Sequence, residues 1–104
     1  MKKPKSKTEY FNYLKQLEFP SQAELDFHNF GILDPYEIER ILTEFIEDCH
    51  ISKLTHVLVI TGKGRVVRPL VHRLLKQSEF VDFFKVAGYH NGNEGAFEVT
   101  LKSV

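Results

Sequence analysis

The chain has 104 residues, 42% of them hydrophobic and 27% charged, and its acidic and basic residues balance to a formal charge of zero. This length and composition predict one globular domain and exclude a disordered chain. The longest apolar run, residues 57–60, is too short to cross a bilayer, and no apolar segment follows the N-terminal lysines, so we expect no membrane partner, no signal peptide and a cytoplasmic protein.

The N-terminal segment is expected to be an appendage. Residues 1–7 carry four lysines and predict a flexible basic tail. A short helix over residues 8–18 is predicted by apolar residues at helical spacing, namely Tyr10, Phe11, Leu14 and Leu17. We therefore assign residues 1–22 to a basic tail and short helix, and residues 23–104 to a single domain.

The domain begins with a strand and a long helix. Residues 23–27 are a short strand candidate. Asp34 is expected to cap a helix, because Pro35 follows it at the first helical position and Glu37 lies three residues on. This helix should end near His50. Its apolar face is formed by Ile38, Ile41, Leu42, Phe45, Ile46 and Cys49, the last of which we expect to be a buried structural thiol.

Three strands and a second helix are predicted in the remaining sequence. Residues 56–61 predict a central strand buried on both faces, because the run is apolar and rich in β-branched residues. The helix that follows must hold Pro69 in its first turn, and its inner face is formed by Val67, Val71, Leu74 and Leu75. Residues 83–87 and 96–101 are strand candidates, joined by a glycine-rich loop of hairpin type over 88–95. In the last strand, apolar residues alternate with Glu98, Thr100 and Lys102, which predicts one solvent-exposed face.

The element order is β-α-β-α-β-β after a first short helix. Alternating strands and helices predict an α/β fold, a two-layer sandwich in which two helices pack on a mixed sheet.

The charges are unevenly distributed along the chain. Residues 34–48 contain six acidic residues and one basic residue, a formal charge of −5. Residues 62–76 contain five basic residues and no acidic residue, a formal charge of +5. A neutral protein with one basic face can still attract phosphate. Solvated helix faces are the alternative interpretation.

A glycine turn, residues 61–64 (TGKG), follows the central strand. This position, at the carboxyl end of a strand and before a helix, is where open α/β sheets place ligands. The spacing of the glycines excludes both the P-loop and the dinucleotide-binding pattern. Glycine N–H groups can form an anion nest, and Lys63, Arg65 and Arg68 supply positive charge. An anion site is weighed against a tight turn with solvated basic residues.

Asp26 and His28 form the second constellation. Residues i and i+2 of a strand point to one face, so the carboxylate and the imidazole are expected side by side. An acid beside histidine can fix its tautomer, as a general base or acid requires, whereas a structural pair is the alternative. The histidines show no metal-ligand spacing, so no metal site is predicted and a divalent ion such as magnesium is the one cofactor left open.

Four segments in order resemble the small MutS-related (Smr) domain family. Residues 25–29 (LDFHN) resemble its LDLHG motif, and residues 59–64 (VITGKG) resemble its TGxG segment. Residues 67–71 (VRPLV) resemble its L-R-x-x-V helix start, and residues 92–101 (GNEGAFEVTL) resemble its closing G-G-x-G-A-x-x-V-x-L. The sequence departs from these motifs at Asn29, where the family has glycine.

The resemblance implies a sandwich similar to the C-terminal domain of bacterial translation initiation factor three. It also implies a nuclease function, since family members nick DNA or cut RNA. Carried over, Asp26 and His28 would be the catalytic pair. The nucleic-acid-binding residues expected from this loop and from the basic segment after it are Thr61, Gly62, Lys63, Gly64, Arg65 and Arg68.

Two functions remain open at this point. One is an endonuclease that nicks DNA or cuts RNA, with RNA the easier substrate because its 2′-hydroxyl supplies an internal nucleophile. The other is a non-cleaving module that docks on nucleic acid or on a ribosome through the same basic face. In either case we expect a monomer.

Overall fold

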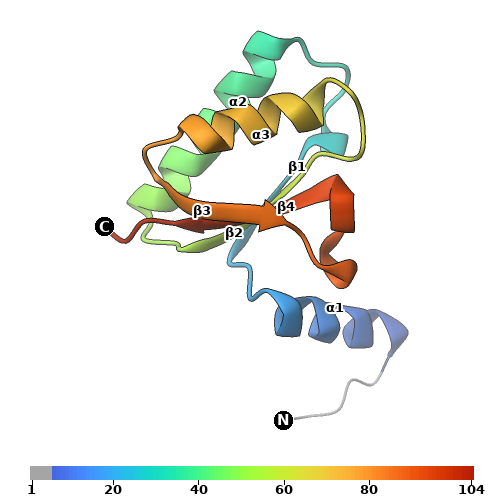
Figure 1. Ribbon diagram of the computed structural model, residues 1–104. Helices are drawn as coiled ribbons and strands as arrows, with labels where there is room; N and C mark the ends of the chain where they lie inside the picture. The colour runs from blue at the N-terminus through green and yellow to red at the C-terminus, as the bar shows by residue number, and fades with distance from the viewer. Residues whose placement is uncertain (1–5) are drawn as a thin grey trace.

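The structure is a computed structural model that describes residues 6–104. Helices α2 (Pro35–Ile51) and α3 (Val67–Gln77) cover one face of a four-stranded sheet, and α1 (Lys7–Glu18) lies on the other side (Figure 1). The α/β sandwich with a preceding short helix is therefore confirmed. Residues 1–5 of the expected basic tail lie outside the described residues, and Lys7 already belongs to α1.

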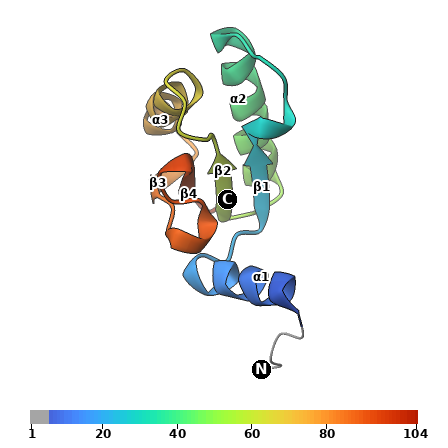
Figure 2. The same cartoon turned by 90° about the vertical axis from the view of Figure 1, so that its right-hand side faces the viewer.

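The sheet consists of β1 (Ala23–Asp26), β2 (His56–Ile60), β3 (Val81–Val86) and β4 (Ala96–Leu101). Their spatial order is β1-β2-β4-β3, with β1 parallel to β2 and the other two pairs antiparallel, so the sheet is mixed as predicted. Figure 2 shows β1 and β2 side by side, running in the same direction. The carboxyl ends of these two strands consequently meet at one edge of the sheet.

The start of α2 follows the predicted capping pattern. The Asp34 side chain accepts a hydrogen bond from the Glu37 N–H at 2.8 Å, and the Glu37 side chain accepts one from the Asp34 N–H at 3.2 Å. Pro35 occupies the first turn, where its missing N–H group costs nothing. This cap fixes where the helix begins and therefore which of its faces meets the sheet.

The main core lies between the helices and the sheet. β2 is an interior strand whose three middle residues are buried, which confirms the predicted central strand. Cys49 is 6% exposed and confirms the expected buried thiol. Burial raises the pKa of this thiol, and the nearby negative charge of Asp48 raises it further.

The predicted solvent-exposed face of the last strand is wrong. Glu98 is only 4% exposed, although it alternates with apolar residues. Its carboxylate accepts a hydrogen bond from the Gly88 N–H at 2.9 Å and lies 3.8 Å from the Lys85 ammonium. On this side of the sheet Leu58 packs in a second apolar cluster with Ala87 and Ala96. The reason is tertiary: β4 is interior, and the loop before it folds back over the strand.

Within residues 6–104, no helix combines the length and the apolar character that crossing a bilayer requires.

Candidate functional site

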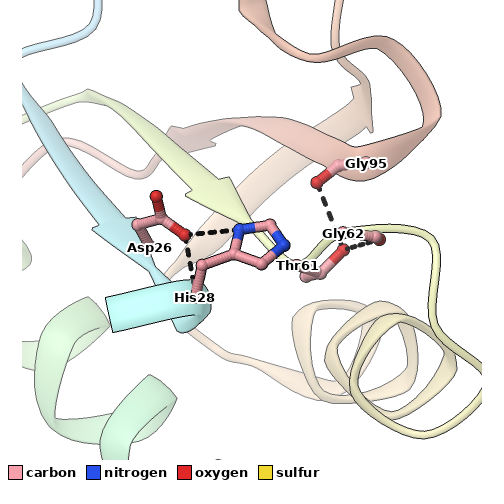
Figure 3. Close-up of polar contacts among 5 residues, drawn as sticks. All are labelled: Asp26, His28, Thr61, Gly62 and Gly95. Carbon is pink, nitrogen blue, oxygen red and sulfur yellow. Dashed lines mark hydrogen bonds and ion pairs between the residues drawn. The ribbon is translucent and has the colours of Figure 1, made fainter. Parts of the chain in front are cut away.

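The candidate site lies where β1 and β2 end. β1 and β2 are paired up to Asp26 and Ile60, so the segments that follow them emerge together. After β1 the chain enters a one-turn 3-10 helix, η1 (Phe27–Asn29), which contains His28. After β2 it enters the glycine turn of residues 61–64. Figure 3 shows the His28 ring between Asp26 and Gly62.

The structure brings Asp26 and His28 together, although not by the route expected from the sequence. The strand ends at Asp26 rather than continuing to residue 27, and His28 lies in η1. One oxygen of Asp26, Oδ1, accepts the His28 backbone N–H at 2.9 Å and lies 2.9 Å from His28 Nδ1. The aspartate therefore caps the short helix and orients the imidazole at the same time.

This contact determines which imidazole nitrogen is free. An ionised carboxylate can only accept hydrogen bonds, so Nδ1 of His28 must be the donor to Asp26. In the neutral ring the lone pair is then on Nε2, on the side that faces the glycine turn. The His28 side chain is 63% exposed.

The glycine turn is built for close contact with His28. Gly62 has φ of 72°, which is a left-handed conformation. A Cβ atom at this position would lie 2.8 Å from His28 Nε2, a distance that would force the ring to move. The left-handed conformation favours glycine, and the absence of a Cβ atom leaves room for the His28 ring.

The expected anion nest is wrong for the first half of the turn. The N–H groups of Thr61 and Gly62 both donate to the Gly95 carbonyl, each at 2.9 Å, because hydrogen bonding between β2 and β4 continues into the turn. The Thr61 hydroxyl donates to the Gly62 carbonyl at 2.7 Å (Figure 3). These two N–H groups are committed to the fold, so contact with an anion falls to residues further along the turn.

The basic residues of the turn divide into exposed and anchored ones. Lys63 and Arg65 are exposed. Arg68 is half-buried: its Nε donates to the Glu94 carbonyl at 2.6 Å, and its guanidinium lies 5.1 Å from the centre of the Phe97 ring. A hollow of about 490 Å³ beside the turn is lined by Lys63, Arg68, Val86 and Glu94. Arg68 thus contributes charge to this hollow and also holds the chain around it.

Sequence reasoning missed the residues that hold the turn from behind. The Gly95 carbonyl accepts hydrogen bonds from both N–H groups of the turn, and the Glu94 carbonyl accepts one from Nε of Arg68. Both lie in the segment that resembles the closing family motif, which was the only sequence signal for them. Their role depends on backbone carbonyls, which a residue pattern does not reveal.

Asp26 is the one carboxylate that contacts the His28 side chain within residues 6–104. Across residues 6–104, no three side chains of histidine, cysteine, aspartate or glutamate are grouped in a way that could hold a metal ion. Asp26 and His28 alone provide fewer protein ligands than a zinc site requires. We therefore derive no chemical step through a metal.

A sequence model of the Smr domain matches residues 25–102. Endonuclease MutS2 from two strains of Clostridium botulinum (Eklund 17B and Alaska E43) is 30% identical to the chain over 71 residues, which is 67% of this chain. The matched region is 9% of the length of those curated relatives, so the chain corresponds to a small part of them.

Two solved structures share this fold. The Smr domain of Thermus thermophilus MutS2 has a TM-score of 0.69 and 22% identity, covering 77% of this chain and 98% of that one. YdaL, a stand-alone small MutS-related protein from Escherichia coli, has a TM-score of 0.71 and 26% identity, covering 99% of this chain and 82% of that one. The second match includes nearly all of the chain, whereas the first leaves part of it uncovered.

Proposed function

The chain belongs to the Smr domain family, and from that premise we propose that it is an endonuclease that cleaves a phosphodiester bond of a nucleic acid beside His28. The observation that carries the proposal is the exposed imidazole whose Nδ1 is held by Asp26 at 2.9 Å. The printed name of the MutS2 relatives, endonuclease, supports the same class of reaction.

In the proposed mechanism His28 is the general base. Its Nε2 takes the proton from the attacking hydroxyl, and Asp26 stabilises the imidazolium that forms. Lys63, Arg65 and Arg68 draw the phosphate to the turn and offset the negative charge that develops on it. The proposed catalytic pair, Asp26 and His28, lies on the side of Gly62 that faces β1 (Figure 3).

RNA is the proposed substrate class. In RNA the neighbouring 2′-hydroxyl attacks the phosphorus once Nε2 of His28 has removed its proton, and the 5′-oxygen leaves with a proton from solvent. The products are a 2′,3′-cyclic phosphate and a free 5′-hydroxyl. Hydrolysis of DNA instead needs an activated water, for which metal ions are the usual means. RNA cleavage by the internal 2′-hydroxyl does not depend on such an ion, so it is the reaction that Asp26 and His28 can assist by themselves.

The test compares labelled single-stranded RNA with the same strand made of deoxynucleotides, and with nicked, branched and supercoiled DNA. Each is incubated with EDTA or with magnesium. We expect RNA cleavage in EDTA and a loss of about 10²- to 10⁴-fold in His28→Ala, which is the usual contribution of a general base. His72→Ala, at an exposed histidine of α3, is the matched control and should cleave normally. Cleavage that persists in His28→Ala would refute the mechanism.

A non-cleaving module that binds nucleic acid or a ribosome is the second candidate. The observation that favours it is the exposure of Lys63 and Arg65, which can bind phosphate without any help from His28. Binding without cleavage under every condition would select this candidate. In both cases affinity should fall steeply with salt. In a double variant, Lys63→Ala with Arg65→Ala, the slope of log affinity against log salt concentration should fall by the amount that about two phosphate contacts contribute.

We further propose that the protein acts as a cytoplasmic monomer. Residues 23–104 would be the unit that acts on nucleic acid, preceded by a separate segment of residues 1–22. The family match over residues 25–102 supports this division. Sedimentation of the full chain at several concentrations tests the monomer, and a concentration-dependent mass would contradict it.

A further inference from the structure

The loop between β3 and β4, residues 87–95, touches two parts of the molecule that are far apart in sequence. We call it the β3–β4 loop. It contains two short 3-10 helices, η2 (Tyr89–Asn91) and η3 (Asn93–Gly95). Its first half contacts the C-terminal end of α1, and its last residue holds the glycine turn of the site. Figure 2 shows the loop between α1 and the ends of the strands.

Glu18 is the residue of α1 that holds the first half of the loop. Its Oε2 accepts the His90 N–H at 2.8 Å and the Asn91 side-chain Nδ2 at 3.3 Å. The same Nδ2 donates to the Lys15 carbonyl at 3.0 Å. A Cβ atom at Gly88 would lie only 2.8 Å from Glu18 Oε2, so the loop backbone is packed against this carboxylate.

These contacts fix the orientation of a buried side chain. Asn91 is 3% exposed, and its Nδ2 faces two acceptors from α1. Turning the amide over would place its oxygen against those acceptors, so only one orientation satisfies them. Its Oδ1 has no hydrogen-bond partner within residues 6–104. The orientation of the Asn91 side chain is therefore set by α1, while its backbone N–H donates to the Gly88 carbonyl at 3.0 Å.

Hydrogen bonds are prominent in the attachment of α1 to the β3–β4 loop. No side chain within the helix is fully buried. Phe19, the residue after it, is buried and its ring lies 5.3 Å from that of His56. The hydrogen bonds of Glu18 and Lys15 join the end of α1 to the loop.

The other end of the loop determines where Gly62 lies. Between Asn91 and Gly95 the chain turns through two left-handed residues, Gly92 with φ of 103° and Asn93 with φ of 51°. The Gly95 carbonyl then accepts the N–H groups of Thr61 and Gly62. Since the His28 ring rests against Gly62, a shift of Gly95 changes the position of the proposed base.

We propose that Glu18 is a positioning residue for the site formed by Gly62 and His28. α1 precedes the region matched by the family, which begins at residue 25, yet it acts on the site through the β3–β4 loop. The carboxylate of Glu18 holds the loop, the loop sets the Gly95 carbonyl, and this carbonyl sets the turn. The part of this inference that concerns cleavage depends on the proposed function, whereas the part that concerns geometry does not.

The first test measures geometry without any substrate. Amide hydrogen exchange is followed in the full chain for wild type, Glu18→Ala and Glu18→Gln. We expect exchange at Thr61 and Gly62 to become about tenfold faster in Glu18→Ala, since a hydrogen bond to a charged group is among the stronger ones. Glu18→Gln keeps one acceptor oxygen and should lie between the two. Glu39→Ala, at an exposed glutamate of α2 on the opposite side of the sheet, is the matched control.

Two results of this test would decide the matter. If exchange accelerates at His90 but stays at the wild-type rate at Thr61 and Gly62, the loop does not transmit the change and the inference is overturned. If Glu18→Ala unfolds, Gly88→Ala replaces it, because its added Cβ displaces the Glu18 carboxylate while leaving the residue in place. The same pattern at Thr61 and Gly62 is expected from that variant.

The second test measures RNA cleavage by the same proteins. Small misplacements of about 1 Å can cost up to a hundredfold in rate, so we expect kcat to fall about tenfold to a hundredfold in Glu18→Ala, with KM little changed. Equal kcat in wild type and Glu18→Ala would overturn the role of Glu18. If wild type cleaves nothing but exchange at Thr61 and Gly62 responds, the positioning role stands and the proposed function fails.

Discussion

Replacing Gly62 by alanine tests how the turn and His28 depend on each other. The substitution adds one Cβ atom at a residue whose φ is 72°. That atom would lie 2.8 Å from Nε2 and 3.3 Å from Cε1 of His28. Two separate costs follow: a strained backbone, and a displaced imidazole ring.

The backbone cost can be estimated from the conformation. An ordinary residue held in the left-handed region costs about 1–2 kcal/mol relative to the right-handed helical one. For a domain of this size, each kcal/mol corresponds to a fall in Tm of about 4–8 °C. The steric cost should be smaller, because the His28 side chain is 63% exposed and can rotate away. We therefore expect Gly62→Ala to lose about 1–2 kcal/mol of stability, mainly from the backbone.

A second variant separates the two costs. Asparagine tolerates the left-handed region better than most residues, so Gly62→Asn should recover part of the lost stability. It still carries a Cβ atom, so it should displace the His28 ring as alanine does. The displacement of the His28 ring is then expected in both variants, with different losses of stability.

The assay combines urea unfolding with the NMR signals of the His28 ring. Gly64→Ala is the matched control: it lies in the same turn, no atom lies within 4 Å of its would-be Cβ, and its φ is not positive. This variant should keep the wild-type stability and the wild-type His28 signals. If Gly62→Ala and Gly64→Ala behave alike in both measurements, the reasoning about the turn is refuted.

Three further predictions concern the rest of the fold. Glu98→Ala should lose about 1–3 kcal/mol in urea unfolding, because it leaves a loop N–H group without its acceptor, whereas Lys85→Ala should lose less than about 1 kcal/mol, since that side chain is 70% exposed. The pKa of Cys49 is raised by burial and by Asp48, so the thiol ionises at lower pH in the unfolded chain than in the folded one. The free energy of unfolding should therefore fall as pH rises above about 8.5. If Cys49→Ala shows the same fall of stability with pH as wild type, this prediction is contradicted. Asp34→Ala should lose about 0.5–2 kcal/mol through the lost helix cap, and an unchanged unfolding midpoint would argue against the cap.

The fold was predictable where the signals are local. The cap at Asp34 and the position of Pro69 depend on residues close together in sequence, and the structure confirms both predictions. The β-branched run of residues 56–61 identified the central strand for a similar reason. Local patterns indicate which face of a helix or strand is apolar. That information is sufficient to predict the order of the elements and the two layers of the sandwich.

The site was predictable only in part. One of its features depends on a side chain that competes with the strand for a backbone N–H group, and another depends on a contact between residues far apart in sequence. At Asp26 the side chain captures the His28 N–H, and this local bond ends the strand and starts η1. At the glycine turn the two N–H groups bond to Gly95, whose closeness follows from the pairing of β2 with β4. Glu98 was misjudged because its burial also comes from elements distant in sequence.

The hydrogen bonds from the turn to Gly95 also have a consequence for the synthesis of the protein. During translation Asp26, His28 and the turn itself emerge from the ribosome before β4 does, and β4 is the last element in chain order. The turn cannot gain its acceptor until that strand has been made and paired, a long-range step that is intrinsically slow. A nascent chain would therefore carry His28 well before it carries the turn in its final position.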